Sequence, residues 1–176
     1  MLAINVAGLL GSTPGTSRRY PVADLRLDLG DDLLQAETIV GSVRLTRTNR
    51  GLFVDGLLAT ALVERCGRCL TPVTAPVEVE LREEALPTVD LGTGQLVEQP
   101  GEADVLRIDE HHVLDLEPAV RDAISLAEPM RILCRDACAG LCPNCGRDLN
   151  LEPHRHEHEP DPRLAPLARL LDEERN

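Results

Sequence analysis

Two pairs of cysteines are the residues of this sequence with the clearest capacity for chemistry. Cys66-Gly67-Arg68-Cys69 and Cys142-Pro143-Asn144-Cys145 share the Cys-x2-Cys spacing, and each pair has a glycine beside a cysteine. A two-residue gap lets both sulfurs of a pair face one point, and the glycine lets the backbone turn tightly around it. Two such turns supply four thiolates, which complete the tetrahedral shell of a structural zinc ion. The first prediction is therefore one zinc ion per chain, held by Cys66, Cys69, Cys142 and Cys145.

A second set of four cysteines offers a local alternative. Cys134, Cys138, Cys142 and Cys145 form a C-x3-C-x3-C-x2-C run that can close a zinc site without the first pair. Either arrangement leaves two of the six cysteines over, as a reserve pair, a second weak site or buried apolar side chains. Disulfides are rare among reduced cytosolic thiols, and iron–sulfur and thioredoxin-like sites place their cysteines differently. The sequence therefore predicts zinc and leaves its four ligands open between the two sets.

The histidines carry a weaker signal. His154, His156 and His158 alternate in a polar stretch bounded by prolines. Such a tract can form a second weak metal site, or it can be a solvated segment without a ligand. The sequence shows no Ser-His-Asp arrangement and no glycine loop for phosphate. Because a structural zinc has no open coordination position, we expect no catalytic residues and no enzyme activity.

The elements that must position these cysteines begin with β-strands. Val43 and Leu45 alternate with polar neighbours, and the segment from 77 to 82 alternates apolar and charged residues, which is the two-residue period of a half-buried strand. An apolar run from Leu52 to Val63 lies between them, after a turn at 49–51. Three strands with short connections predict an antiparallel meander, and an earlier strand is expected over roughly 22–29.

The second half adds a helix and a cysteine-rich segment. Apolar residues at 3.6-residue spacing predict a helix that starts near an N-cap at Asp115 and ends before Pro129. We expect an α+β fold, in which an antiparallel β-meander is packed by one or two helices and carries a cysteine zinc-knuckle module. The predicted division is an α+β domain at 1–130 with an acidic loop near 87–104, a cysteine-rich zinc-binding segment at 131–151, and a polar tail at 152–176 that ends in a short amphipathic helix.

Charge is distributed unevenly along the chain. The net charge is −12, and the stretch from Glu78 to Glu128 alone has a balance of −11, which suits a basic protein partner. The stretch from Glu37 to Leu70 has a balance of +2. Its arginines predict a contact with RNA phosphate, although a solvated surface is the simpler interpretation: Arg44, Arg47 and Arg50. The apolar runs are too short for a signal peptide or a membrane span, so we expect a cytoplasmic protein.

Four segments of the sequence match a known protein family: ERCGRCLTPV (64–73), IDEHHVLDLEPAVRDAISLAEPM (108–130), LCRDACAGLCPNCGRDLN (133–150) and DPRLAPLARLL (161–171). In these segments the sequence resembles the YceD family of large ribosomal RNA subunit accumulation proteins. The third segment is the most specific of them. The resemblance implies a cytoplasmic protein that is needed for processing or stable accumulation of 23S ribosomal RNA. It implies no enzyme activity, and it implies that the zinc is a stabiliser, because the family includes members that lack many of the cysteines.

The function expected from these observations is that of a non-enzymatic zinc-binding factor for 23S ribosomal RNA and large-subunit assembly. Its expected partners are large-subunit precursors, met through a basic ribosomal protein and through 23S rRNA itself. No membrane and no small-molecule substrate are expected. Two alternatives remain: a zinc-stabilised regulator that binds another protein, and an RNA-processing enzyme, for which the sequence offers no paired acids in a recognisable nuclease motif.

Overall fold

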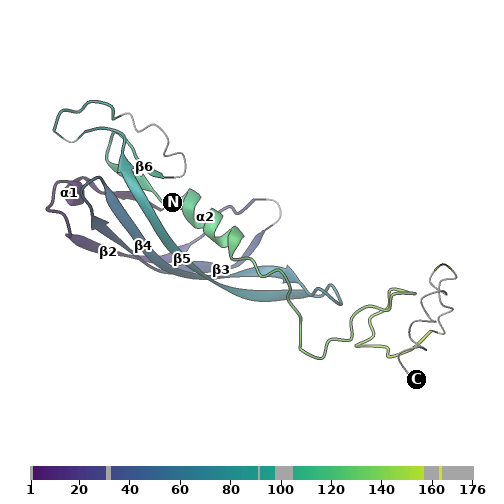
Figure 1. Ribbon diagram of the computed structural model, residues 1–176. Coiled ribbons are helices and arrows are strands. Elements are labelled where there is room, and N and C mark those ends of the chain that lie inside the picture. The colour runs from purple at the N-terminus through teal and green to yellow at the C-terminus, as the bar shows by residue number, and fades with distance from the viewer. Residues whose placement is uncertain (1, 31–32, 91, 98–104, 157–162, 164–176) are drawn as a thin grey trace, which may run out of the picture.

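The computed structural model describes residues 2–30, 33–90, 92–97, 105–156 and 163 (Figure 1). Within this part of the chain, the strands form one seven-stranded sheet in the order β1-β7-β6-β5-β4-β3-β2. Neighbouring strands are antiparallel except β5 and β6, which are parallel. The elements in chain order are β1 (Ala3–Asn5), α1 (Ala7–Leu10), β2 (Ser17–Leu25), β3 (Leu34–Arg47), β4 (Leu52–Arg65), β5 (Pro72–Pro87), β6 (Leu106–Ile108), β7 (Val113–Asp115) and α2 (Glu117–Leu126).

The predicted meander is confirmed as β3, β4 and β5. The earlier strand expected over 22–29 lies instead at β2, Ser17–Leu25, and overlaps the prediction only over 22–25. Long β3, β4 and β5 pair over most of their length, so that Val43 faces Gly56 and Gly56 faces Leu81. Val43 and Leu45 are fully buried, as the alternating pattern predicted, and the apolar residues of β5 point to the same core. The inward residues of the three strands therefore form one apolar surface that a helix can cover.

Helix α2 covers that surface (Figure 1). It begins at Glu117, two residues after the predicted cap, although the Asp115 carboxylate still accepts the Glu117 backbone N–H at 3.0 Å. Val120 and Ile124 are buried on the strip that faces the sheet, together with Leu116 at the helix start. The sheet curves around this helix (Figure 1). The described fold is mostly antiparallel β with two short helices.

Four short elements at the ends of the sheet were not predicted: β1, α1, β6 and β7. Strands of three residues are too short to show a period, so their pairing is decided by tertiary contacts. β1 pairs with β7, and the Leu2 backbone N–H donates to the Glu117 carboxylate at 2.9 Å. In the predicted acidic loop, residues 88–90 and 92–97 are described, and a bridge between Val89 and Leu96 joins these two pieces. Residues 98–104 and the predicted amphipathic helix beyond 163 lie outside the described residues.

The β4–β5 hairpin extends past the end of α2, and its turn lies farthest from the rest of the sheet (Figure 1). The cysteine-rich segment meets the hairpin at this turn, where the Gly67 N–H donates to the Ile132 carbonyl at 2.8 Å. A hydrogen bond between such distant residues brings Cys66 and Cys69 to the cysteines that follow α2. Among the described residues, no helix is both long enough and apolar enough to cross a membrane.

Candidate functional site

Four cysteine sulfurs gather where the hairpin turn meets the segment after α2. Cys66, Cys69, Cys134 and Cys138, which we call the four-cysteine group, have their Sγ atoms within 4.8 Å of one another. The Cys66–Cys138 pair is separated by 3.8 Å and the Cys69–Cys134 pair by 3.6 Å. Four thiolates at about 2.3 Å from a tetrahedral zinc ion lie roughly 3.8 Å apart. The four sulfurs therefore have the spacing of a tetrathiolate metal site, and all four are free thiols.

The backbone holds the four-cysteine group by hydrogen bonds on both sides. In the hairpin turn, the Leu70 N–H donates to the Cys66 carbonyl at 2.9 Å, and Leu70 itself takes a left-handed φ of 61°. Across the junction, the Arg68 guanidinium donates to the Cys138 carbonyl at 2.7 Å, and the Leu141 N–H donates to the Arg68 carbonyl at 3.0 Å. Three of the four cysteines are buried, so the group is shielded from solvent on most sides.

Hydrogen bonds within the four-cysteine group shift the pKa values of its thiols. Backbone N–H groups, that of Cys69 first and those of Cys134 and Arg68 after it, lower the pKa of Cys66 to about 6. The Thr71 hydroxyl and N–H lower the pKa of Cys69, whereas the hydrogen bond with Cys69 and burial raise the pKa of Cys134 to about 12. These hydrogen bonds therefore favour the thiolate form of Cys66 and Cys69 and the protonated form of Cys134. When a divalent cation binds, it displaces the protons that remain on the cysteine sulfurs.

A second group lies in the loop that follows. Cys142, Cys145, His154 and His156 place one sulfur or ring nitrogen each within 4.8 Å of the others. The Cys-x2-Cys turn is closed by a hydrogen bond from the Gly146 N–H to the Cys142 carbonyl at 2.8 Å. Gly146 has a φ of 71°, the same left-handed conformation as Leu70 after the first turn. The two predicted knuckles are therefore alike in backbone but separate in space.

The structure thus combines the predicted ligands differently from either predicted set. Cys66 and Cys69 are brought to Cys134 and Cys138, and the turn at 142–145 is brought to two histidines. The hairpin turn contacts residues 132–141, so the cysteines nearest to α2 reach it first. One sequence signal was available, because Cys134-x3-Cys138 is itself a ligand pair within the usual zinc spacing. His158 lies outside the described residues.

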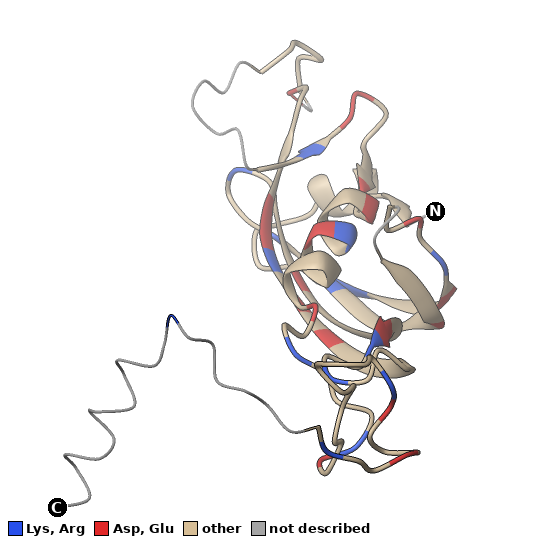
Figure 2. Ribbon diagram, turned by 90° about the vertical axis from the view of Figure 1, so that its right-hand side faces the viewer, with Lys and Arg blue, Asp and Glu red and all other residues tan. Residues whose placement is uncertain are grey.

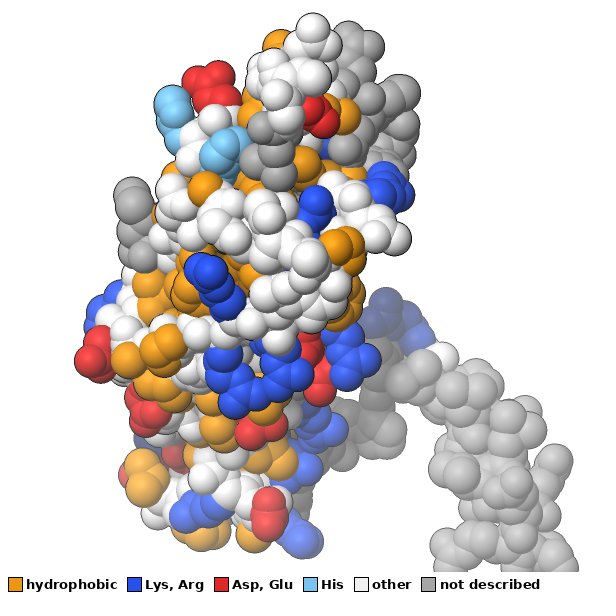
Figure 3. Space-filling view, turned by 90° about the vertical axis from the view of Figure 1, so that its left-hand side faces the viewer, with side chains coloured by type: hydrophobic (Ala, Val, Ile, Leu, Met, Phe, Trp, Pro, Cys, Tyr) orange, Lys and Arg blue, Asp and Glu red, His pale blue; other side chains and the backbone are white. Residues whose placement is uncertain are grey.

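Two arginines face each other on the outer face of the sheet, away from α2. Arg19 of β2 is the cross-strand partner of Arg44 of β3, and both side chains are exposed. They line a shallow hollow of about 260 Å³ together with Ser42, Asp55 and Leu57. Figure 3 views the end of the sheet where β2 begins and β3 ends, and basic side chains gather there beside apolar ones. We call Arg19 and Arg44 the arginine pair.

The three predicted RNA-contacting arginines do not share one surface. Arg44 is exposed, but Arg47 is half-buried and donates to the carbonyls of Leu10, Thr48 and Gly51 at 2.6–2.9 Å. Arg47 is out of phase with Arg44 along β3, so its side chain joins α1 to the β3–β4 turn. Arg50 lies in that turn. The cross-strand neighbours of Arg44 are instead Arg19 of β2, which is distant in sequence, and Asp55 of β4.

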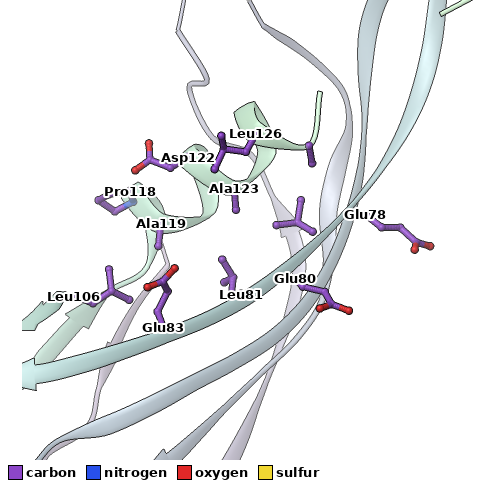
Figure 4. A pocket seen from close by; sticks show the side chains of 12 residues that line it. Glu78, Glu80, Leu81, Glu83, Leu106, Pro118, Ala119, Asp122, Ala123 and Leu126 are labelled. Atoms are coloured by element: carbon purple, nitrogen blue, oxygen red, sulfur yellow. The ribbon is translucent and has the colours of Figure 1, made fainter. Parts of the chain in front are cut away.

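An acidic groove runs between β5 and α2 (Figure 4). It has a volume of about 410 Å³, and Leu81, Leu106 and Ala123 contribute its apolar lining. Glu83 points toward the helix across the groove from Asp122, whereas Glu78 and Glu80 point to the other side of β5 (Figure 4). No arginine is among the residues that line the groove within the described chain. Figure 2 shows acidic residues on α2 and on the strand beside it, with a basic residue among them on each element.

Comparison with known proteins places these features in context. A family model described as "Large ribosomal RNA subunit accumulation protein YceD" matches residues 54–171. An uncharacterized protein of Mycobacterium tuberculosis is 40% identical over 131 residues, which cover 73% of this chain and 60% of the relative. The chain therefore spans about three fifths of the length of the mycobacterial relatives that it matches.

One of two more distant relatives carries a functional name. A maize protein named "Large ribosomal RNA subunit accumulation protein YCED homolog 1, chloroplastic" is 28% identical over 167 residues, which cover 80% of this chain and 57% of the relative. The uncharacterized protein YlbN of Bacillus subtilis is 26% identical over 147 residues, which cover 81% of this chain and 80% of the relative. No solved structure matches the chain.

Proposed function

The chain belongs to the YceD family, and on that premise we propose that it is a non-enzymatic factor for the synthesis, processing or accumulation of 23S ribosomal RNA and for assembly of the large ribosomal subunit. The observation that carries this proposal is the family match over residues 54–171, which includes both cysteine groups and α2. The printed name of the maize relative supports the same process. The factor works in the compartment where the large subunit is built, which is the cytoplasm of a bacterium.

The metal part of the proposal is a structural zinc ion at the four-cysteine group. Four soft sulfur donors at tetrahedral spacing fit zinc and leave no position for a substrate or a water molecule. The ion would join the β4–β5 hairpin turn to the segment after α2. The proposed role of the ion is therefore to stabilise the end of the sheet. The proposed binding surfaces for RNA and protein lie elsewhere.

The arginine pair is the proposed contact with RNA. Arginine binds phosphate through two parallel N–H groups, and Arg19 and Arg44 present two guanidinium groups from neighbouring strands. Phe53 of β4 is 40% exposed on the same face, where an aromatic ring can stack on an unpaired base. The face turns acidic toward β5, where Glu78 and Glu80 are exposed, so RNA would contact the β2–β3 side.

The acidic groove is the proposed contact with a basic ribosomal protein. β6 pairs with β5 only over Ala85–Pro87, so among the described strands none pairs with the outer edge of the rest of β5, beside the groove. An extended peptide can add to such an edge by backbone hydrogen bonds. Glu83 and Asp122 would face its lysines and arginines, and the apolar lining would receive their aliphatic stems.

Depletion of the protein tests the proposed process. We expect 23S rRNA to fall relative to 16S rRNA, and 23S precursors to increase, because a large-subunit factor acts on one of the two ribosomal RNAs. The measurement is quantification of both RNAs from depleted and complemented cells. An unchanged ratio, with the protein found in the light fractions of a sucrose gradient, would instead favour the zinc-stabilised regulator of another protein.

Neutralising the groove tests the protein partner. Replacing Glu83 with Gln and Asp122 with Asn should weaken co-sedimentation with large-subunit precursors roughly three- to tenfold, because complementary charge speeds association and fixes orientation. Glu110→Gln, which removes an exposed acid that does not line the groove, is the control and should bind normally. Equal binding of the double variant and the control would remove the groove from the proposed interface.

A further inference from the structure

We propose that Cys142, Cys145, His154 and His156 form a second zinc site, so that the chain binds two zinc ions rather than one. This inference concerns a different set of ligands from the four-cysteine group and does not depend on the ribosomal role. It rests on the position of four donor atoms, on the support of one histidine by the backbone, and on the way the loop is tied to its surroundings.

The donor set is complete and convergent. Two sulfurs and two ring nitrogens lie within 4.8 Å of one another, although His154 follows Cys145 by nine residues along the chain. Residues 153–156 have no helical or strand structure, and the rings of His154 and His156 lie edge to face with their centroids 5.0 Å apart. Both histidine rings therefore lie next to the turn that carries Cys142 and Cys145. Two cysteines with two histidines make one of the standard shells of structural zinc.

His154 is held in the orientation of a metal ligand. Its Nδ1 lies 2.7 Å from the Glu152 backbone carbonyl, so Nδ1–H donates there and Nε2 carries the lone pair. Nε2 lies 3.1 Å from the Cys145 sulfur. In proteins, a histidine bound to a metal almost always donates its other ring N–H in this way. A zinc ion at usual bond lengths would separate this nitrogen and sulfur by about 3.5 Å, which needs a shift of a few tenths of an ångström.

The loop around the site is tied together on both sides. The Cys142 N–H donates to the Arg147 carbonyl at 2.8 Å, and the Arg147 guanidinium pairs with the Glu152 carboxylate at 3.1 Å. Asn150 then connects the loop to the four-cysteine group, because its side chain accepts the Ala139 N–H at 2.8 Å and lies 3.5 Å from the Cys138 sulfur. The two sites are thus neighbours that share one support, with separate ligands.

The two sites also differ in accessibility. In the four-cysteine group three of the four ligands are buried, whereas in the second group one cysteine is buried and Cys145 and His156 are exposed. An exposed site exchanges its ion and loses it to a chelator more readily than a buried one. The second zinc should therefore be the first to leave when a chelator is added.

The test is zinc stoichiometry of the full chain, measured by native mass spectrometry and elemental analysis under reducing conditions. We expect two equivalents in the unchanged protein and one in Cys142→Ser and in the double variant His154→Ala, His156→Ala. His111→Ala, which removes an exposed histidine outside both groups, should retain two. Circular dichroism of the sheet reports whether each variant is folded, since α2 and the strands contribute no ligand to the second group.

Cobalt replacement supplies an independent measurement. The second site contains two of the six thiolates, so Cys142→Ser should remove about a third of the sulfur-to-cobalt absorption once its site is empty. Cys66→Ser should remove about two thirds. One equivalent of zinc in the unchanged protein that Cys142→Ser retains, two equivalents retained in the histidine variant, or iron in place of zinc would each overturn the second site. Failure of the four-cysteine site would appear separately, as normal metal content in Cys66→Ser.

Discussion

Replacing Cys66 with serine should release the zinc ion of the four-cysteine group and detach the segment after α2 from the hairpin turn. Structural zinc contributes an apparent binding free energy of about 10–16 kcal/mol in zinc-finger peptides, and this energy is folding energy. A serine hydroxyl is a much poorer zinc ligand than a thiolate. Loss of one equivalent by elemental analysis, with faster amide hydrogen exchange over 132–141, is the expected result.

The choice of variants separates the observed grouping from both groupings that the sequence predicted. Cys134→Ser should release the same ion as Cys66→Ser, because both sulfurs belong to one group. Cys145→Ser is the matched control, since it removes a cysteine from the other group and should leave the hydrogen exchange of 132–141 nearly unchanged. If Cys66→Ser and Cys145→Ser instead release one and the same ion, the two Cys-x2-Cys turns share a site and the grouping in the structure is wrong.

Replacing both Arg19 and Arg44 with glutamine should weaken binding to ribosomal precursors about tenfold at low salt. Each phosphate contact to single-stranded nucleic acid contributes about 0.7 to the slope of log affinity against log salt, so the slope should fall by roughly 1.4. The fold should be preserved, because exposed charges on a strand change stability by less than about 0.5 kcal/mol. Co-sedimentation at several salt concentrations measures both effects.

Two further arginines make the experiment specific. Arg82→Gln removes an exposed arginine that lies on the same face but 3.4 Å from the Glu80 carboxylate, and it should bind normally. Arg47→Gln should act through stability instead, since it removes three hydrogen bonds to backbone carbonyls. Unchanged affinity and unchanged salt slope in the Arg19 and Arg44 double variant would show that this face does not meet RNA phosphate.

The buried faces of β3 and β5 could be predicted because each of these strands carries its own alternating pattern. Val43 and Leu45 alternate with polar residues, and so do the apolar residues of β5, which fixes the buried face of each strand locally. The run from Leu52 to Val63 is apolar on both faces, so its sequence does not show that Leu58 is buried while Leu57 is 60% exposed. That choice follows from the register of β4 between its two neighbours.

The sequence predicted the type of ligand at the metal site but not which cysteines share one site. The Cys-x2-Cys spacing is a local property of the backbone. The left-handed residue of the second turn is the expected glycine, Gly146, whereas in the first turn it is Leu70 and not Gly67. Which turn meets which further ligands depends on where the hairpin ends relative to α2, a distance set by strand length and packing. The tertiary structure alone decides that Cys66 meets Cys138, and that the His154 ring lies against the Cys145 sulfur.

The arginines show the same division. The sequence determines that Arg44 points away from the core, because it alternates with Val43 and Leu45. It does not determine that Arg47 donates to the Leu10 carbonyl or that Arg19 lies opposite Arg44, since both contacts join residues that are distant along the chain. Local pattern thus specifies the direction of a side chain, and the fold specifies its neighbours.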